Sequence, residues 1–309
     1  QSFFLFSGMA NTIKFQLIDV FTSEPFGGNP LAIFDNADNL SAEQMLKIAK
    51  ELNLSESVFL HKASDEADVK MRIFTPGMEL PTAGHPTIGT AYYLLKEKGI
   101  TPKKENELLL EQNIGNLKVQ YEKKQDEISK ILMEQPLPKF EQTFKDKKLV
   151  ASLLSIEEDE IEEDFPCRIV NCGNPFLIVP IRALSTVQKL KLNNELFSEI
   201  LDEIFITGVI AFTMETLFKE HITHSRMFAP HIGVAEDPAT GSAHGPLASY
   251  LHNYNMVDLS ELSIGEQGYE LGRPSQIKMK IEQEEGKISK VMVGGSCVQM
   301  GNGEIRIPE

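Results

Sequence analysis

Cysteine is scarce in this sequence. The 309 residues include only Cys167, Cys172 and Cys297, and no two of them form a Cys-x-x-Cys pair. Three cysteines are too few for a disulfide framework. Proteins without disulfides are typical of compartments that keep thiols reduced, so we expect a cytoplasmic protein.

Positive charge is also in short supply. Lys and Arg number 30 against 45 Asp and Glu, which gives a net charge of −15 at pH 7. A surface this acidic is repelled by nucleic-acid phosphates and by anionic membranes. We therefore expect no nucleic-acid partner and no membrane partner, and an anionic substrate would have to be held by local groups.

No hydrophobic run is long enough to cross a membrane. The most apolar long stretch spans 15 residues, 204 to 218, and contains Glu215, whereas a spanning helix needs roughly 20. We predict a core strand there instead. The opening residues lack the basic segment of a signal peptide. We expect Met9 to be the native start and residues 1–8 to be an expression remnant.

The chain contains an internal repeat. The motifs Gly-Asn-Pro, Phe-x-Pro and Glu-x-Pro-x-x-Gly occur in the same order in each half, starting at Gly28 and at Gly173. The Glu, Pro and Gly of the last motif keep one offset, because 236 − 79, 238 − 81 and 241 − 84 all equal 157. The alternative is coincidence between common turn signals. An offset near half of the chain, and a length of about two 150-residue domains, indicate two similar domains rather than a solenoid.

Hydrophobic periodicity predicts mixed strands and helices in both halves. In the first half we expect strands at 13–20, 30–34, 57–60, 69–74 and two within 117–134, and helices at 41–52 and 86–98. Ser41 and Gln44 have the spacing of a helix-capping box. In the second half we expect strands near 169 and at 176–179, 204–213, 227–228, 276–282 and 287–293, helices at 194–201 and 243–252, and a turn at 301–303.

Two helix N-termini follow the repeated glycines. Gly84 and His85 precede one predicted helix, and Gly241 and Ser242 precede the other. Helix N-termini expose unpaired N–H groups and a partial positive charge, so both can bind an anion. Two such ends facing each other across a cleft would hold a small carboxylate. The alternative is that each Gly only makes a tight turn and that Ser242 is only an N-cap.

Three titratable residues are candidates for acid–base chemistry. Glu56 lies where a helix meets an apolar strand, and burial there would raise its pKa toward neutrality. His85 and Asp237 flank the paired glycines and would reach the same cleft. Each also has an ordinary explanation: Glu56 as a surface acid at a helix end, and His85 as a helix cap.

No other motif points to a cofactor. His221, His224 and His231 have no carboxylate or cysteine ligands at standard metal-site spacing, so we expect no metal. The sequence contains no P-loop and no nucleophile elbow, and the Gly301-Asn302-Gly303 segment lacks the strand-to-helix setting of a dinucleotide site.

Taken together, these motifs resemble the PhzF-like family of the phenazine-biosynthesis isomerase. The Asp237-Pro-Ala-Thr-Gly-Ser segment is the most specific match, and the similarity extends over nearly all of the chain. The resemblance implies a diaminopimelate-epimerase-like α/β fold: two pseudo-symmetric domains, each a curved, mostly antiparallel sheet around a central helix. It also implies a cofactor-free isomerase that forms a homodimer. We place the domains at 9–140 and 141–295, with a linker near 136–143 and a final strand, 296–309, that completes the first domain.

The resemblance also implies roles for individual residues. Glu56 matches the general acid/base, and His85, Asp237 and Ser242 match the polar shell of the active site. Gly84 and Gly241 match glycines whose neighbouring amides bind substrate. Related amino-acid epimerases carry a thiol base on each half, but the corresponding positions here are Ala83 and Thr240. Residue identity therefore excludes a two-thiol racemase mechanism.

The leading hypothesis is a cofactor-independent isomerase of a small carboxylic acid. Glu56 would remove a proton from carbon and return it elsewhere on the same π system. Two alternatives remain at this point. One is a carboxylate-binding protein of the same fold without turnover, and the other is a lyase that uses the same acid–base residues, because both isomerases and lyases begin with proton abstraction.

Overall fold

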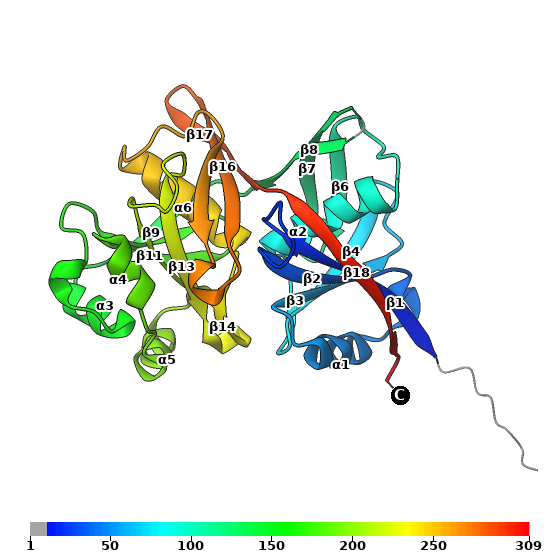
Figure 1. Cartoon of the computed structure of the whole chain (residues 1–309), viewed down its shortest axis with the longest axis horizontal. Coiled ribbons are helices and arrows are strands. Elements are labelled where there is room, and N and C mark those ends of the chain that lie inside the picture. Colours follow the sequence, from blue (N-terminus) through cyan, green and yellow to red (C-terminus); the bar gives the residue numbers. More distant parts are fainter. Residues whose placement is uncertain (1–10, 126, 309) are drawn as a thin grey trace, which may run out of the picture.

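The computed structural model describes residues 11–125 and 127–308, so Met9 and the remnant expected at residues 1–8 lie outside the described part of the chain. The protein forms two lobes that lie side by side (Figure 1). Their strands belong to one sheet of 18 strands that continues through both lobes. None of the described helices is long and apolar enough to span a membrane.

The first half supplies one lobe and the strand that leaves it. Its elements are β1 (Thr12–Val20), β2 (Asn29–Phe34), η1 (Ala37–Asn39), α1 (Ala42–Leu52), β3 (Glu56–His61), β4 (Val69–Phe74), β5 (Glu79–Leu80), α2 (Gly84–Tyr92), the π-helix η2 (Tyr93–Glu97), β6 (Glu107–Gln112), β7 (Gly115–Lys124), β8 (Glu127–Gln135) and β9 (Lys139–Phe144).

The second half contains more helices on its outer side. Its elements are α3 (Lys147–Leu154), η3 (Glu158–Glu160), β10 (Cys167–Asn171), β11 (Pro175–Pro180), α4 (Leu184–Lys189), α5 (Asn194–Glu203), β12 (Gly208–Thr213), β13 (Thr223–Ala229), η4 (Pro230–Ile232), β14 (Val234–Asp237), α6 (Gly241–Asn253), β15 (Ser263–Gln267), η5 (Tyr269–Leu271), β16 (Ser275–Glu284), β17 (Lys287–Gly294) and β18 (Cys297–Arg306).

The two halves share one strand connectivity. In the first half β1–β2 is antiparallel, β2–β3 parallel, β3–β4 antiparallel, β4–β6 parallel, and β6–β7–β8 antiparallel. In the second half β10–β11, β11–β12, β12–β13, β13–β15 and β15–β16–β17 follow the same sequence of orientations. The repeat seen in the motifs is therefore a repeat of structure.

The halves are joined at β8 and β17, and each then passes a strand to the other. β8 and β17 pair antiparallel, with Leu132 opposite Gly294. After β8 the chain enters β9, which pairs with β10, and after β17 it enters β18, which lies along β1 (Figure 1). A domain boundary at 140/141 would fall inside β9. The division into domains stays a prediction, and the pairing of β9 favours a boundary just before it.

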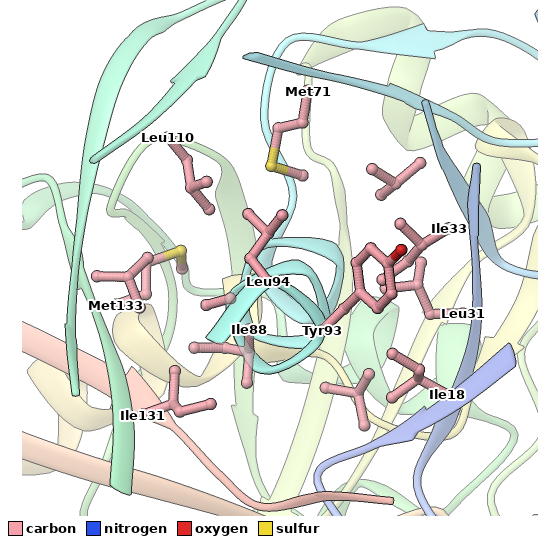
Figure 2. Packing of buried hydrophobic residues seen from close by; sticks show 14 of the residues in the cluster. Ile18, Leu31, Ile33, Met71, Ile88, Tyr93, Leu94, Leu110, Ile131 and Met133 are labelled. Atoms are coloured by element: carbon pink, nitrogen blue, oxygen red, sulfur yellow. The ribbon is translucent and has the colours of Figure 1, made fainter. Parts of the chain in front are cut away.

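Each lobe is built around one helix. The α2 helix is buried along almost its whole length, as expected for a helix enclosed by a sheet. Ile88 of α2 and Leu94 of η2 lie among Leu31, Met71 and Ile131, which come from three different strands (Figure 2). In the second lobe α6 contributes its apolar residues to a core formed with β10 to β13, β16 and β17. α1 and α3–α5 form separate outer clusters.

Local signals predicted most elements correctly. The Ser41 hydroxyl accepts from the Gln44 N–H at 3.2 Å and the Gln44 amide accepts from the Ser41 N–H at 3.0 Å, so the capping box is confirmed. Two predictions were wrong. The strand expected at 204–213 starts only at Gly208, because α5 runs to Glu203. Residues 301–303 form no turn but pair with β1 inside β18, where the sheet compels an extended backbone.

The junction of β8 and β17 yields a stability prediction. A Cβ atom on Gly294 would lie 1.9 Å from the carbonyl oxygen of Ile131, so Gly294→Ala forces the two strands apart. We expect it to lower the free energy of unfolding by about 1–3 kcal/mol. Gly301→Ala is the control, because its Cβ would meet nothing within 4 Å, and we expect a change within about 0.5 kcal/mol. Urea denaturation measures both, and equal effects would contradict the prediction.

Candidate functional site

The first turns of α2 and α6 touch each other. A Cβ atom on Gly84 would lie 2.5 Å from the backbone nitrogen of Ser242 and 2.9 Å from Cα of Gly241. A Cβ atom on Gly241 would lie 2.7 Å from the ring of Phe21. Both positions therefore need glycine for close approach. The two helix ends that we expected to face each other across a cleft are in direct contact.

A cavity of about 300 Å³ lies beside these helix ends and is lined by both halves. Its walls are largely apolar, with Leu80, Phe176, Met227 and Ile232 among them. Its polar lining consists of Glu56, Thr82, Asn174, Thr207, His231, Asp237, Thr240 and Ser242. Ser242 thus borders the cavity, and Gly84 and Gly241 do not. None of the described lining residues is Lys or Arg, and the two helix N-termini contribute partial positive charge.

Glu56 opens β3 and is held there by the parallel pairing of β3 with β2, where it lies opposite Leu31. Its side chain is 12% exposed. Burial, and next the nearby charge of Asp237, raises the pKa of the Glu56 carboxyl well above its usual range. The Oε2 atom is buried and has no hydrogen-bond partner among the described residues. Glu56 thus borders the cavity with a carboxyl group of raised pKa, one oxygen of which has no hydrogen-bond partner among the described residues.

His85 stands behind Glu56 in the first turn of α2. Its Nδ1 atom lies 3.3 Å from Oε2 of Glu56, without the alignment of a hydrogen bond. The ring is buried, and burial lowers the pKa of His85 to about 3. The imidazole is therefore neutral at physiological pH. It can orient or hydrogen-bond the Glu56 carboxyl group but carries no charge of its own.

Asp237 comes from the second half of the chain and is held by three hydrogen bonds. Its Oδ1 atom accepts from Asn29 Nδ2 at 2.8 Å and from the Ser55 hydroxyl at 2.9 Å. Its Oδ2 atom accepts from the Thr240 hydroxyl at 2.6 Å. Burial raises the pKa of Asp237 to about 6, although these hydrogen bonds act in the other direction. The structure thus brings Glu56, His85 and Asp237 together, but in different surroundings.

The sequence did not predict several residues that belong to this site. Asn29, Ser55 and Thr240 hold Asp237, and Gln267 accepts from the Thr240 N–H at 3.1 Å and donates to the Asp237 carbonyl at 2.6 Å. Asn29 belongs to the repeated Gly-Asn-Pro motif, so the repeat could have identified it. Gln267 carried no such signal, because it reaches the site only through sheet pairing.

The repeated Glu of each half has a structural partner. Arg72 binds Glu79 through two hydrogen bonds of 2.8 and 2.7 Å, and Arg226 binds Glu236 through two of 2.7 and 2.8 Å. Paired hydrogen bonds of this kind fix geometry as well as charge. An Arg stands two residues before the Phe of both Phe-x-Pro motifs, so the repeat contained this signal too.

Two histidines outside the site, His221 and His224, share one carboxylate partner. The Nδ1 atoms of His221 and His224 each lie 2.8 Å from an oxygen of Glu266, and Glu270 lies 2.8 Å from the other nitrogen of His224. In residues 11–125 and 127–308, no group of three or more His, Cys, Asp or Glu is arranged to hold a metal ion. His231 lies apart from them, on the cavity wall.

No thiol is in a position to act as a base. Ala83 and Thr240 are the N-cap residues of α2 and α6. Burial raises the pKa of Cys167 and of Cys172 to about 12, and it also raises the pKa of Cys297. The three thiols therefore stay protonated near neutral pH.

A family model described as phenazine biosynthesis-like protein matches residues 18–303. The chain belongs to this PhzF-like family. It is 33% identical over 290 residues to trans-2,3-dihydro-3-hydroxyanthranilate isomerase of Pseudomonas aeruginosa, covering 94% of this chain and 98% of the relative. Uncharacterized isomerase YddE of Escherichia coli is also 33% identical, over 293 residues, covering 93% and 96%. The relatives of the PhzF-like chain are thus named isomerases, which sets its enzyme class.

Solved structures agree with the PhzF-like fold. A PhzF-family phenazine biosynthesis protein from Bacillus anthracis aligns with a TM-score of 0.86 and 30% identity, covering 96% of this chain and 99% of that one. A hydroxyproline epimerase from Agrobacterium vitis aligns with a TM-score of 0.64 at 12% identity, covering 96% and 91%. The second likeness concerns the fold alone. The expected epimerase-like α/β fold is confirmed.

The buried Glu56 carboxyl group gives a prediction for stability. Because its pKa is raised in the folded state, the folded protein loses stability relative to the unfolded chain as pH rises from about 4.5 through the raised pKa. Glu56→Gln removes this loss. We expect the variant to be more stable than wild type by about 1–3 kcal/mol at pH 8, with a smaller difference at pH 5.

Urea denaturation at the two pH values measures this effect. Glu43→Gln is the control, since the Glu43 side chain is 77% exposed on α1, and we expect no comparable gain. A Glu56→Gln protein that is equally or less stable than wild type at pH 8 would contradict the raised pKa.

Proposed function

We propose that this protein is a cofactor-independent isomerase of a small carboxylic acid, in which Glu56 alone moves a proton between two carbons of one π system. The observation that carries the proposal is the Glu56 carboxyl group: nearly buried, raised in pKa, without a hydrogen-bond partner on Oε2, and on the wall of the cavity. A base with these properties is matched to proton transfer near neutral pH.

The surroundings of the two carboxyl groups support Glu56 rather than Asp237 as the base. Asp237 accepts three hydrogen bonds, from Asn29, Ser55 and Thr240. These donors stabilise its charged form and fix its position. Among the residues that the structure describes, none donates to Oε2 of Glu56. We propose that Asp237 supplies a fixed negative charge that keeps Glu56 basic.

The proposed reaction is a proton shift. The Glu56 carboxylate takes a proton from carbon, and the C–H electron pair enters the adjacent π system. The double bond moves by one position, and the Glu56 carboxylic acid returns the proton at the far carbon. Neutral His85 orients the carboxyl group. N–H groups at the uncapped ends of α2 and α6 hold the substrate carboxylate and stabilise the negative charge that develops.

The broken symmetry of the repeat favours a shift over inversion at carbon. Glu56 lies opposite Leu31 in the first half, and the equivalent position in the second half, opposite Phe176, is Gly208. Ala83 and Thr240 also lack a basic group. With one base, the proton leaves and returns on one face of the substrate, whereas inversion needs bases on both faces.

The first acid to test is trans-2,3-dihydro-3-hydroxyanthranilate, after which the Pseudomonas relative is named. We expect Glu56→Gln to lower its turnover by about 10²–10⁴-fold, because general acid–base catalysis contributes this much. The dissociation constant should change by only a few-fold, since Gln has nearly the same shape. Deuterium uptake at carbon in D₂O, followed by mass spectrometry, measures the proton transfer itself.

Glu43→Gln, which removes one exposed carboxyl group, is the matched control and should keep full activity. Retained turnover in Glu56→Gln would contradict the assignment of the base. Binding of the acid by wild type without deuterium uptake would favour a carboxylate-binding protein. Uptake with loss of a substituent would indicate a lyase.

The coupling of Glu56 and Asp237 predicts the pH profile. Activity should rise with pH as Glu56 loses its proton, with the inflection of kcat/KM well above pH 4.5. Asp237→Asn removes one cause of the raised pKa, so the inflection should move to lower pH. Asp202→Asn on the exposed side of α5 is the control. An unchanged inflection in Asp237→Asn would contradict the coupling.

The homodimer that the family resemblance implies, and the cytoplasmic location expected from the low number of cysteines, are also part of this proposal. The low number of cysteines, none of them in a disulfide, supports a reducing compartment. Size-exclusion chromatography with light scattering would measure the oligomeric state.

A further inference from the structure

The carboxyl group of Asp237 has no counterpart in the first half of the protein. Asp237 lies on β14 opposite Met227, and the equivalent position on β5, opposite Ile73, is Leu80. The repeat therefore places a carboxyl group on one side of the site and an isobutyl group on the other. Both side chains border the same cavity.

The donors that hold Asp237 do have counterparts. Asn29 stands directly before Pro30 at the start of β2, and Asn174 stands directly before Pro175 at the start of β11. Ser55 precedes Glu56, and Thr207 precedes Gly208, the residue equivalent to Glu56 in the strand register. The second half thus keeps an amide and a hydroxyl group, on Asn174 and Thr207, although the equivalent of Asp237 is Leu80, which cannot accept their hydrogen bonds.

Asn174 and Thr207 both border the cavity, as do Leu80 and Ala83. Among the described residues neither the Asn174 amide nor the Thr207 hydroxyl has a hydrogen-bond partner, whereas Asn29 and Ser55 both donate to Asp237. The third donor on Asp237 is the Thr240 hydroxyl, and Ala83 in its place leaves additional room.

We propose that Asn174 and Thr207 form the subsite for the substrate carboxylate, which takes the place that a carboxyl group on residue 80 would occupy. This deepens the proposed function and rests on it for the identity of the ligand as a carboxylic acid. The bound carboxylate would mirror the Asp237 carboxylate, with an amide and a hydroxyl as donors. The N-terminus of α2, which has no side-chain cap on Ala83, lies next to it and adds its partial positive charge.

Binding of a matched pair of probes tests the subsite without turnover. The probes are 3-hydroxyanthranilate and 2-aminophenol, which is the same ring without the carboxylate. We expect the double variant Asn174→Ala, Thr207→Val to bind 3-hydroxyanthranilate about 10–100-fold more weakly than wild type, because hydrogen bonds to a charged group are lost. For 2-aminophenol, the dissociation constant of the double variant, measured by calorimetry, should lie within about 3-fold of the wild-type value. Equal losses for the two probes, or no loss for either, would overturn the proposal.

Leu80→Asp provides a second test, because it restores a carboxyl group at the empty position. The new carboxylate should accept hydrogen bonds from Asn174 and Thr207. It should therefore exclude 3-hydroxyanthranilate and weaken its binding by at least about 100-fold. Leu80→Asn, which has the same size and no charge, is the control and should bind it better than Leu80→Asp by tenfold or more. Equal affinity of the two variants would count against the subsite.

If wild type binds neither probe, folding stability tests the subsite instead. In the Leu80→Asp background, Asn174→Ala should lower the folding equilibrium constant by about tenfold more than it does in wild type, since the new acid loses a donor. Additive effects would overturn the proposal. The subsite is tested by probe binding and stability, whereas the isomerase proposal is tested by deuterium uptake and by the turnover of Glu56→Gln. Because Glu56→Gln should leave probe binding intact, one proposal can fail without the other.

Discussion

The contact between the first turns of α2 and α6 is the constraint on which the rest of this molecule depends. Gly84 and Gly241 let the two helix ends approach so closely that a Cβ atom on either would collide with a neighbour. Because each helix is the centre of its own lobe, this contact fixes the distance between the lobes. It also directs two partly positive N-termini toward one cavity, whose described lining residues include no Lys or Arg.

The exchange of strands reinforces this arrangement. β9 and β18 each leave the half that precedes them and pair with the first strand of the other, while β8 and β17 pair at the junction. The two lobes therefore cannot separate without breaking backbone hydrogen bonds between paired strands. The cavity lies between parts that are tied together on two sides, so its polar groups can keep a defined geometry, as Asp237 does with donors from Asn29 and Ser55.

Chemistry enters where the repeat is broken. Connectivity, the central helices and the pairs Arg72–Glu79 and Arg226–Glu236 are kept in both halves. At the cavity, however, Glu56 faces the site from one half and Gly208 stands in its place in the other, and Asp237 corresponds to Leu80. Symmetry supplies a rigid frame with two equivalent helix ends. In the function proposed above, these differences between equivalent positions supply one base and one fixed charge.

Much of this could be predicted from the sequence by itself. Hydrophobic periodicity and caps determined most strands and helices, and the repeated motifs determined two similar halves and the residues near the helix ends. The errors came where tertiary context overrides local pattern: Gly301 and Gly303 read as a turn, yet sheet pairing with β1 keeps them extended. Only the tertiary structure decided that the helix ends touch, that β9 pairs with the second half, and that Gln267 and Ser55 reach Asp237. Contacts between residues so far apart in the chain, and the burial that shifts the pKa of Glu56 and His85, depend on the packing of the whole molecule, which no local pattern encodes.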